Sequence, residues 1–357
     1  MLSDFPMEKK LPAARRRTTM TPRVATDKGQ ITTPDELLKI AAAFRQSRII
    51  LTAFELGAFT ALATRKRTSV DVAEALRVDE RGLDRLMNAL CALGLLRKRG
   101  RRFSNTSFSE HYLIKGKPDY LGGLVHTATL WNSWTTLTNA VLHGGTVLHG
   151  QAGKGSERKR VQGFIAAMHQ RAFAQASATV RLLDLSGAKK TLDVGAGSGA
   201  FSMALARSKN DIQATVFDLP DVIPLTRSYV SESGLLRRFT FQAGNFHKDE
   251  FDKGYDLILL SAIIHMNSVA DNKRLFKKCV RALNMRGQLV VQDYIMNDNR
   301  TSPAAGALFA LNMLVGTDAG DTYTGKEIRS WMKVAGLSRV RRIETPYDSS
   351  LIIGRKV

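Results

Sequence analysis

The chain has 357 residues, 44% of them hydrophobic, and a formal net charge of +21. That length permits two domains with a sizeable buried core. No apolar run reaches the roughly 18 residues that a membrane-spanning helix needs, and the opening residues do not resemble a secretory signal. The two cysteines, Cys91 and Cys279, are too few for a disulfide framework or a metal site. These features predict a protein of the reduced cytoplasm.

The positive charge has two readings: a solvated basic surface, or a footprint for nucleic acid or an anionic membrane. Part of it lies in residues 1–30, which are rich in Thr, Pro, Lys and Arg and have no hydrophobic period. We expect these residues to form a disordered basic tail. The remaining charge is spread through both halves of the chain, which favours a solvated surface.

Helices are predicted from about residue 31. Thr33 and Pro34, followed by two acids, supply a capping hydroxyl and a proline at the first helical position. A second helical segment, residues 48–62, is rich in Ile, Leu, Phe and Ala. Together with the unit that follows, these segments define a predicted N-terminal domain at residues 31–115.

The rest of this domain has the element order of a winged helix. A short helix is expected at residues 72–76, and a longer one opens at Asp79 or Glu80 with apolar residues at i, i+3, i+4 and i+7. Residues 97–104 then form a basic hairpin with Gly100 at its tip. Helix, helix and hairpin in this order predict a winged-helix fold.

Apolar helices are expected next, over residues 120–141, and another over about 157–185. We interpret residues 116–186 as a helical linker that lines a substrate site. From residue 187 strands and helices alternate, with strands at 190–194, 213–217, 238–242, 255–260 and 288–292. This alternation predicts an α/β domain with a Rossmann-like, doubly wound sheet, whose ligand lies at the carboxyl ends of the first strands.

The strongest motif is a glycine-rich turn after the first of these strands. Asp193 ends the strand, and Gly195, Gly197 and Gly199 let the backbone approach a ligand. The same glycine pattern also fits a dinucleotide site. Asp218 ends the second strand, about twenty residues further on, where its carboxylate can accept both ribose hydroxyls of an adenosine ligand.

Residues 193–199 (DVGAGSG), with 216–222 (VFDLPDV) behind them, resemble the class I S-adenosylmethionine-dependent methyltransferases. More narrowly, the chain is similar to the family that contains caffeic acid O-methyltransferase and hydroxyindole O-methyltransferase. The resemblance runs from about residue 35 to the C-terminus. It implies S-adenosyl-L-methionine as the cofactor, a winged-helix dimerisation domain that makes a homodimer, and a catalytic domain at residues 187–357.

The resemblance also implies roles for cofactor-binding residues. Gly195 and its neighbours, Asp193 and Gly197 among them, would contact the methionine part, Asp218 would hold the ribose, and Leu219 would pack near the adenine.

Three further positions belong to the same predicted cofactor site. Asn245 and Phe246 follow a glycine and match a Gly-Asp-Met/Phe string that flanks adenine in relatives, with Asn in place of the acid. Ser261 stands where many plant relatives have lysine.

Methyl transfer to a hydroxyl needs a base, and His265 is the candidate. It follows the fourth predicted strand closely, and relatives place their general base there. Imidazole suits proton removal at neutral pH. Asp293 ends the fifth strand, so it can accept from one imidazole nitrogen and fix the tautomer. The second acid of plant relatives aligns with Thr322, beside Asp321, so no second orienting acid is assigned.

The acceptor site is the least determined by sequence. Met168 and Met313 match positions where relatives clamp an aromatic substrate, although a helical Met is as often plain core. Other candidates for this site are His126, Trp134 and Asn312, with Phe164, His169 and Phe309 near them. Their side chains predict a mainly apolar acceptor of medium size.

Three functions compete. The first is a small-molecule O-methyltransferase, with C-, N- or S-methyl transfer as close variants. The second is a nucleic-acid binder or nucleic-acid methyltransferase, favoured by the basic hairpin but opposed by an apolar recognition helix and by the lack of an Asn/Asp-Pro-Pro-Tyr string. The third is a nicotinamide oxidoreductase, which the glycines alone permit. The sequence favours the first.

Overall fold

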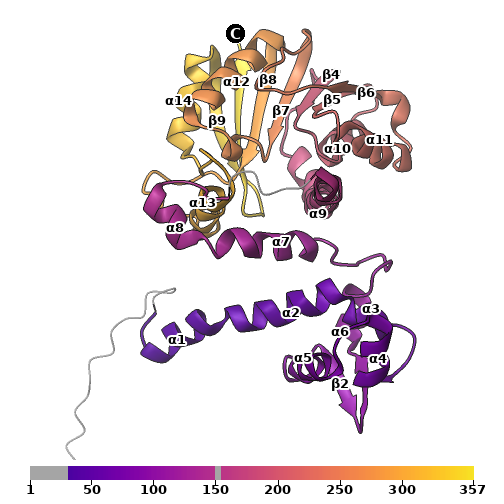
Figure 1. Cartoon of the computed structure of the whole chain (residues 1–357). Helices are drawn as coiled ribbons and strands as arrows, with labels where there is room; N and C mark the ends of the chain where they lie inside the picture. The colour runs from indigo at the N-terminus through magenta and orange to yellow at the C-terminus, as the bar shows by residue number, and fades with distance from the viewer. Residues whose placement is uncertain (1–30, 149–153) are drawn as a thin grey trace, which may run out of the picture. The chain divides into compact units, whose positions relative to one another are not determined.

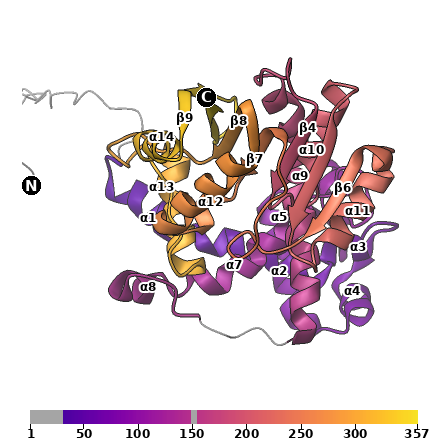
Figure 2. The ribbon, with the colours of Figure 1, turned by 90° about the horizontal axis from the view of Figure 1, so that it is seen from above.

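The computed structural model describes residues 31–148 and 154–357, with the side chains of 31–148 and 161–357. The predicted basic tail, residues 1–30, lies outside the described residues. The chain divides into two units, residues 1–48 and 49–357. Figure 1 and Figure 2 show the elements in two views.

The first unit contains α1 (Pro34–Ala42), and α2 (Phe44–Leu56) runs from it into the second. The predicted cap is present: the Thr33 side chain accepts from the backbone N–H of Glu36 at 3.3 Å, and the Glu36 carboxylate accepts from the backbone N–H of Thr33. Such a reciprocal pair satisfies N–H groups that the first turn leaves without partners. α1 buries none of its residues.

The second unit begins with a small domain of short helices and a hairpin. Its elements are α3 (Ala58–Ala61), β1 (Arg67–Thr68), α4 (Ser69–Leu76), α5 (Glu80–Ala92), β2 (Leu96–Arg99), β3 (Arg102–Asn105) and α6 (Ser107–Tyr112). The predicted order of helix, helix and hairpin is present, and β1 pairs with β3 as a third strand. Met87, Leu90 and Phe103 form part of the buried core that joins α5 to the hairpin.

Three helices lead to the C-terminal half: α7 (Leu124–Trp134), α8 (Leu137–His143) and α9 (Lys154–Val180). α9 ends before the predicted limit at residue 185, because the chain turns at 181–188 toward the first central strand. α7 packs against α9, and α13 (Ala304–Gly316) packs against both α7 and α8. None of the described helices is long and apolar enough to cross a membrane.

A seven-stranded sheet follows, in the order β6-β5-β4-β7-β8-β10-β9. Its strands are β4 (Lys190–Val194), β5 (Gln213–Asp218), β6 (Phe239–Ala243), β7 (Tyr255–Ser261), β8 (Leu283–Asp293), β9 (Leu337–Glu344) and β10 (Ser350–Lys356). The five predicted strands are present and parallel, whereas β10 is antiparallel to both β8 and β9. The sequence patterns did not predict the C-terminal pair of strands, β9 and β10.

Helices cover both faces of the sheet. The helices not yet named are α10 (Ala200–Ser208), α11 (Ile223–Glu232), α12 (Val269–Ala282) and α14 (Gly325–Val334). Ile258 and Leu260 pack with α12 and α14, while Leu257 and Leu259 pack with α9 and α10. Successive residues of a strand face opposite sides, so burial of both faces explains the continuous apolar run of β7. Figure 1 shows the sheet between these two layers.

The strand order positions the ligand site. The chain runs outward from β4 through β5 to β6, then returns to β7 on the other side of β4. Ligands of such sheets bind where the order reverses, at the carboxyl ends of the strands. The glycine turn after β4, Asp218 at the end of β5 and the segment after β7 all lie at this edge.

Candidate active site

The turn after β4 requires glycine. Gly195 has φ +69°, and its N–H donates to the carbonyl of Phe217 at 2.8 Å. A Cβ at this position would clash with the side chain of Ile263, which follows β7. Gly197 also has a positive φ, +56°. Left-handed backbone and close packing therefore bring the turn against the segment that precedes His265.

Asp218 closes this turn from the neighbouring strand. Its Oδ2 accepts from the backbone N–H of Gly197 and its Oδ1 from that of Leu219, both at 2.7 Å. Burial raises the pKa of the Asp218 carboxyl, although these two hydrogen bonds lower it. Each oxygen keeps a second lone pair, so the carboxylate can still accept from two hydroxyls. Leu219 is 49% exposed and offers an apolar surface beside it.

The predicted adenine-flanking segment lies next to Asp218. The backbone N–H of Gly244 donates to the Asp218 carbonyl at 2.9 Å. Asn245 Oδ1 accepts from the backbone N–H of His247 at 2.9 Å, and Phe246 packs partly buried against the core. Ser261 lies at the end of β7, where its hydroxyl donates to Gln292 of the neighbouring strand at 2.6 Å.

Asp193 lies behind the turn. It is 4% exposed, and its Oδ2 accepts from the hydroxyl of Ser202 on α10 at 2.7 Å. Burial raises the pKa of this carboxyl to about 7, although the Ser202 hydrogen bond lowers it. The structure thus places Asp193 where it supports the glycine turn from the side of α10.

This burial predicts a pH-dependent stability. The unfolded carboxyl has a pKa near 3.9, so between pH 4 and 7 the folded protein binds a proton that the unfolded chain lacks. The contribution of Asp193 to the free energy of unfolding therefore falls as pH rises through this window, by at most about 1.4 kcal/mol per pH unit. The Asp193→Asn variant is expected to lose this slope when thermal unfolding is followed from pH 4 to 8. Parallel melting curves for the two proteins would contradict it.

His265 and Asp293 form a buried pair at the ends of β7 and β8. The imidazole Nδ1 lies 2.8 Å from Asp293 Oδ1, and the two residues are 8% and 2% exposed. Oδ2 accepts from the backbone N–H of His265 at 3.4 Å. The predicted hydrogen bond between these side chains is therefore present. Among the described residues no hydrogen bond engages Nε2, which leaves that nitrogen available to a ligand.

A second acid does not reach the ring. The backbone N–H of Asp321 donates to the carbonyl of His265 at 2.9 Å, but its carboxylate accepts from Arg300 at 3.1 Å. Thr322 is 2% exposed, and its N–H donates to Asp321. Within residues 31–148 and 161–357, Asp293 is the only acid bonded to the imidazole.

An aromatic ring borders His265, and a second ring stacks on the first. The His265 ring meets Phe309 of α13 edge-on, with centroids 4.9 Å apart, and Phe309 stacks on Tyr294 at 4.2 Å. One hydrogen bond joins the neighbouring helices α7 and α13. Trp134 Nε1 donates to Asn312 Oδ1 at 3.0 Å, between α7 and α13. The Phe309 contact therefore places α13 beside the imidazole, and the hydrogen bond holds α7 against α13.

The remaining acceptor candidates lie on α7, α9 and α13. His126 of α7 meets Phe164 of α9 edge-on at 5.2 Å. Met313 is buried, and Met168 is half-buried. His169 lies instead at the glycine turn, where its Nδ1 is 2.8 Å from the Ser198 hydroxyl and its ring stacks on Tyr229 at 4.1 Å. Burial lowers the pKa of the His169 imidazole.

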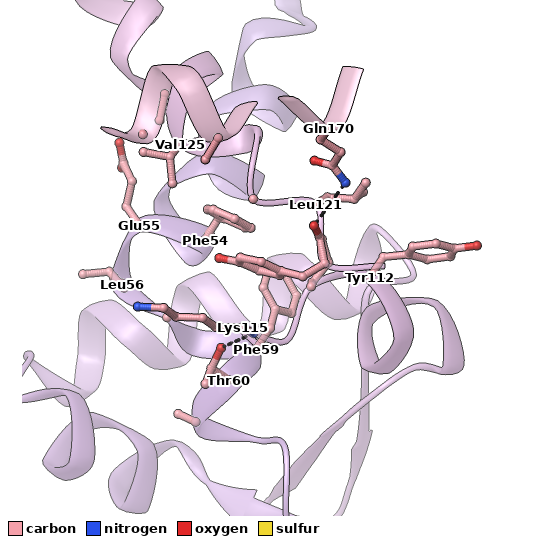
Figure 3. A pocket seen from close by; sticks show the side chains of 18 of the residues that line it. Phe54, Glu55, Leu56, Phe59, Thr60, Tyr112, Lys115, Leu121, Val125 and Gln170 are labelled. Carbon is pink, nitrogen blue, oxygen red and sulfur yellow. Dashed lines mark hydrogen bonds between the residues drawn. The ribbon is translucent and has the colours of Figure 1, made fainter. Parts of the chain in front are cut away.

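Residues of α7 and α9 also line a separate pocket, which is shown in Figure 3. Phe54 stacks on Tyr120 there, with centroids 5.4 Å apart, and Gln170 donates to the Tyr120 carbonyl at 3.1 Å. No catalytic, cofactor or acceptor residue named above, apart from His169, lines it. We do not assign the methyl acceptor to this pocket.

Two protein families match the chain. The O-methyltransferase domain family matches residues 134–338, and the O-methyltransferase dimerisation domain family matches residues 38–115. The chain belongs to the O-methyltransferase family. The methyltransferase uses S-adenosylmethionine as its methyl donor, as the sequence predicted.

Individual relatives agree with this assignment. The methyltransferase is 32% identical to 3-hydroxy-5-methyl-1-naphthoate 3-O-methyltransferase of Streptomyces sahachiroi, over 90% of this chain and 95% of the relative. It is 29% identical to the N,N-dimethyltransferase OxyT of Streptomyces rimosus, over 86% and 91% of the two chains. Its fold matches human N-acetylserotonin methyltransferase, with a TM-score of 0.79 at 23% identity over 93% of this chain and 99% of that one.

The sequence motifs did not indicate two residues beside the site of the methyltransferase, Tyr294 and Arg171. Tyr294 directly follows Asp293, and Arg171 donates to its hydroxyl from α9. Arg171 is three residues after Met168 on a helix, so it shares a face with a predicted acceptor residue. That spacing was the available signal.

Proposed function

We propose that this methyltransferase acts on a hydroxyl group of a small aromatic molecule, with His265 as the general base. The observation that carries the proposal is the buried pair of His265 and Asp293, 2.8 Å apart. This pair lies at the same sheet edge as the glycine turn and Asp218.

The residues at that edge suit the cofactor. Asp218 has free lone pairs for the ribose hydroxyls, and the turn at Gly195 and Gly197 brings the backbone close enough for the methionine part. We assign supporting cofactor contacts to Asp193, Leu219, Asn245, Phe246 and Ser261. When bound, S-adenosylmethionine supplies an electrophilic methyl group on a sulfonium sulfur.

The proton of the acceptor hydroxyl goes to His265. Because Nδ1 donates to Asp293, the neutral imidazole presents Nε2 as an acceptor. Nε2 would take the hydroxyl proton as the acceptor oxygen becomes methylated, with S-adenosylhomocysteine as the leaving group. The Asp293 carboxylate then stabilises the positive charge that the ring gains, and it holds the ring orientation throughout.

Apolar side chains favour an aromatic acceptor. Phe309 borders His265, while Phe164 and Trp134 are 40% and 37% exposed. An aromatic ring that covers them would remove apolar surface from water. We assign acceptor contacts to Trp134, His126, Met168, Asn312 and Met313. Because one relative methylates a hydroxynaphthoate, bicyclic hydroxyaromatics are the first compounds to test.

We further propose a homodimer formed through a winged-helix domain at residues 31–115. The family match to a dimerisation domain supports it, as does α1, which buries none of its residues in the single chain. Residues 116–186 then serve as the helical linker and residues 187–357 as the catalytic domain. The cytoplasmic location stays a prediction.

Two measurements test the function. Calorimetric titration should show binding of S-adenosylhomocysteine and none of NAD or NADP. Methyl transfer from radiolabelled S-adenosylmethionine should then label hydroxyaromatics in a panel that also holds thiols and aromatic amines. The panel includes aromatic amines because the chain is similar to an N,N-dimethyltransferase. Label on amines alone would overturn the proposed acceptor atom, and binding of a nicotinamide alone would overturn the proposed reaction.

A further inference from the structure

Arg171 of α9 is joined to the candidate base by a short series of aromatic contacts. Its guanidinium donates to the Tyr294 hydroxyl and lies 5.2 Å from the centre of the Tyr294 ring. Tyr294 stacks on Phe309 at 4.2 Å, and Phe309 meets the His265 ring at 4.9 Å. The guanidinium therefore lies at the far end of the aromatic wall that borders His265.

The helix places Arg171 in line with acceptor candidates. Phe164, Met168 and Arg171 occupy positions i, i+4 and i+7 of α9, which fall on one helix face. Phe164 contacts His126 of α7 from this face. An aromatic molecule that lies against Phe164 and Met168 thus has Arg171 one helical turn beyond it.

Among the side chains that the structure describes, Arg171 also lacks a charged partner. Within residues 31–148 and 161–357, the groups that it contacts are the neutral Tyr294 hydroxyl and ring, with no carboxylate within ion-pair distance. Some arginines in this half of the chain have acidic partners instead: Arg300 pairs with Asp321 and Glu327, and Arg355 pairs with Asp184. A guanidinium has five N–H donors, and Tyr294 uses only part of this capacity.

We propose that Arg171 binds a carboxylate on the methyl acceptor, so that the enzyme selects acidic hydroxyaromatic molecules. A guanidinium matches a carboxylate with two parallel hydrogen bonds, which fixes orientation as well as charge. With the acid at Arg171 and the ring along Phe309, the opposite edge of the acceptor faces His265. The inference rests on the proposed O-methyl transfer and adds a substrate class to it.

The test uses two acceptors of nearly the same size and shape, of which only one is charged: 3-hydroxy-1-naphthoate and its carboxamide. The wild-type enzyme is expected to favour the carboxylate in kcat/KM. The Arg171→Gln variant is expected to lower kcat/KM for the carboxylate by about 10- to 100-fold, mainly through KM, and that for the carboxamide by less than about 3-fold. Arg171→Lys should restore part of the preference, since it keeps the charge without the planar fork.

Arg281→Gln is the matched control, because it removes an arginine that pairs with Glu250 on the surface of α12, away from the site. It should leave the preference unchanged. Equal losses of kcat/KM on both acceptors in Arg171→Gln would overturn the inference. Weaker binding of S-adenosylhomocysteine by this variant would also overturn it, because the guanidinium would then bind the cofactor's own carboxylate. A wild-type enzyme that methylates the carboxamide equally well overturns the inference while O-methyl transfer stands. Cofactor binding without label on any hydroxyaromatic in the panel overturns the proposed function itself.

Discussion

The His265→Ala variant is expected to lower the turnover number by about 10²-fold or more, while its affinity for S-adenosylhomocysteine stays nearly intact. The loss follows from the geometry of the imidazole. Asp293 occupies Nδ1 at 2.8 Å, so Nε2 is the nitrogen that can take the acceptor proton. Because the ring contacts Phe309 and lies outside the turn to which we assign cofactor binding, its removal should spare the affinity for the cofactor. Turnover and calorimetric affinity are measured on the same preparation.

His111→Ala is a matched control for this experiment. His111 Nε2 also lies 2.8 Å from an aspartate, Asp119, but both side chains are more than half exposed, and His111 belongs to the N-terminal domain. Its turnover should equal that of the wild type. Asp293→Asn should give an intermediate loss, since its amide group can hold the ring in the wrong tautomer. Unchanged turnover in His265→Ala would remove this residue from the mechanism.

The catalytic half was predictable because local patterns and sheet topology agree. Buried parallel strands leave continuous apolar runs such as β7, and helices between them fix the strand direction. The carboxyl ends of neighbouring parallel strands lie together, so the contact between His265 and Asp293 followed from their positions in two strands. The O-methyltransferase assignment followed from the motifs at the same edge.

The C-terminal pair β9 and β10 gave no comparable signal. β9 is an edge strand rich in arginine, and side chains on one of its faces stay exposed, so its hydrophobic pattern is weak. β10 contains Gly354, and its antiparallel register with β8 depends on partners such as Asp293 that lie far away in sequence. The contact between Arg171 and Tyr294 is a similar case, because tertiary packing alone brings two such distant residues together.

The second large effect is expected at Asp218, in the part of the site that we assign to the cofactor. Asp218→Ala should weaken binding of S-adenosylhomocysteine by about 10²-fold, since hydrogen bonds to a charged group contribute roughly 1.5 to 3 kcal/mol each. The substitution removes the acceptor for the ribose hydroxyls and also frees the N–H groups of Gly197 and Leu219. The turn then loses the contact that holds it at the end of β5.

Two further variants separate an effect on cofactor binding from an effect on folding in this experiment. Asp221→Ala removes an exposed carboxylate three residues further along, and its affinity should match the wild type. Asp218→Asn keeps one oxygen acceptor and the size of the side chain, so its affinity should fall between those of the wild type and the alanine variant. Each variant is titrated below its own melting temperature, so that only folded protein is compared. An Asp218→Ala protein that binds as tightly as the wild type would show that groups other than this carboxylate hold the ribose.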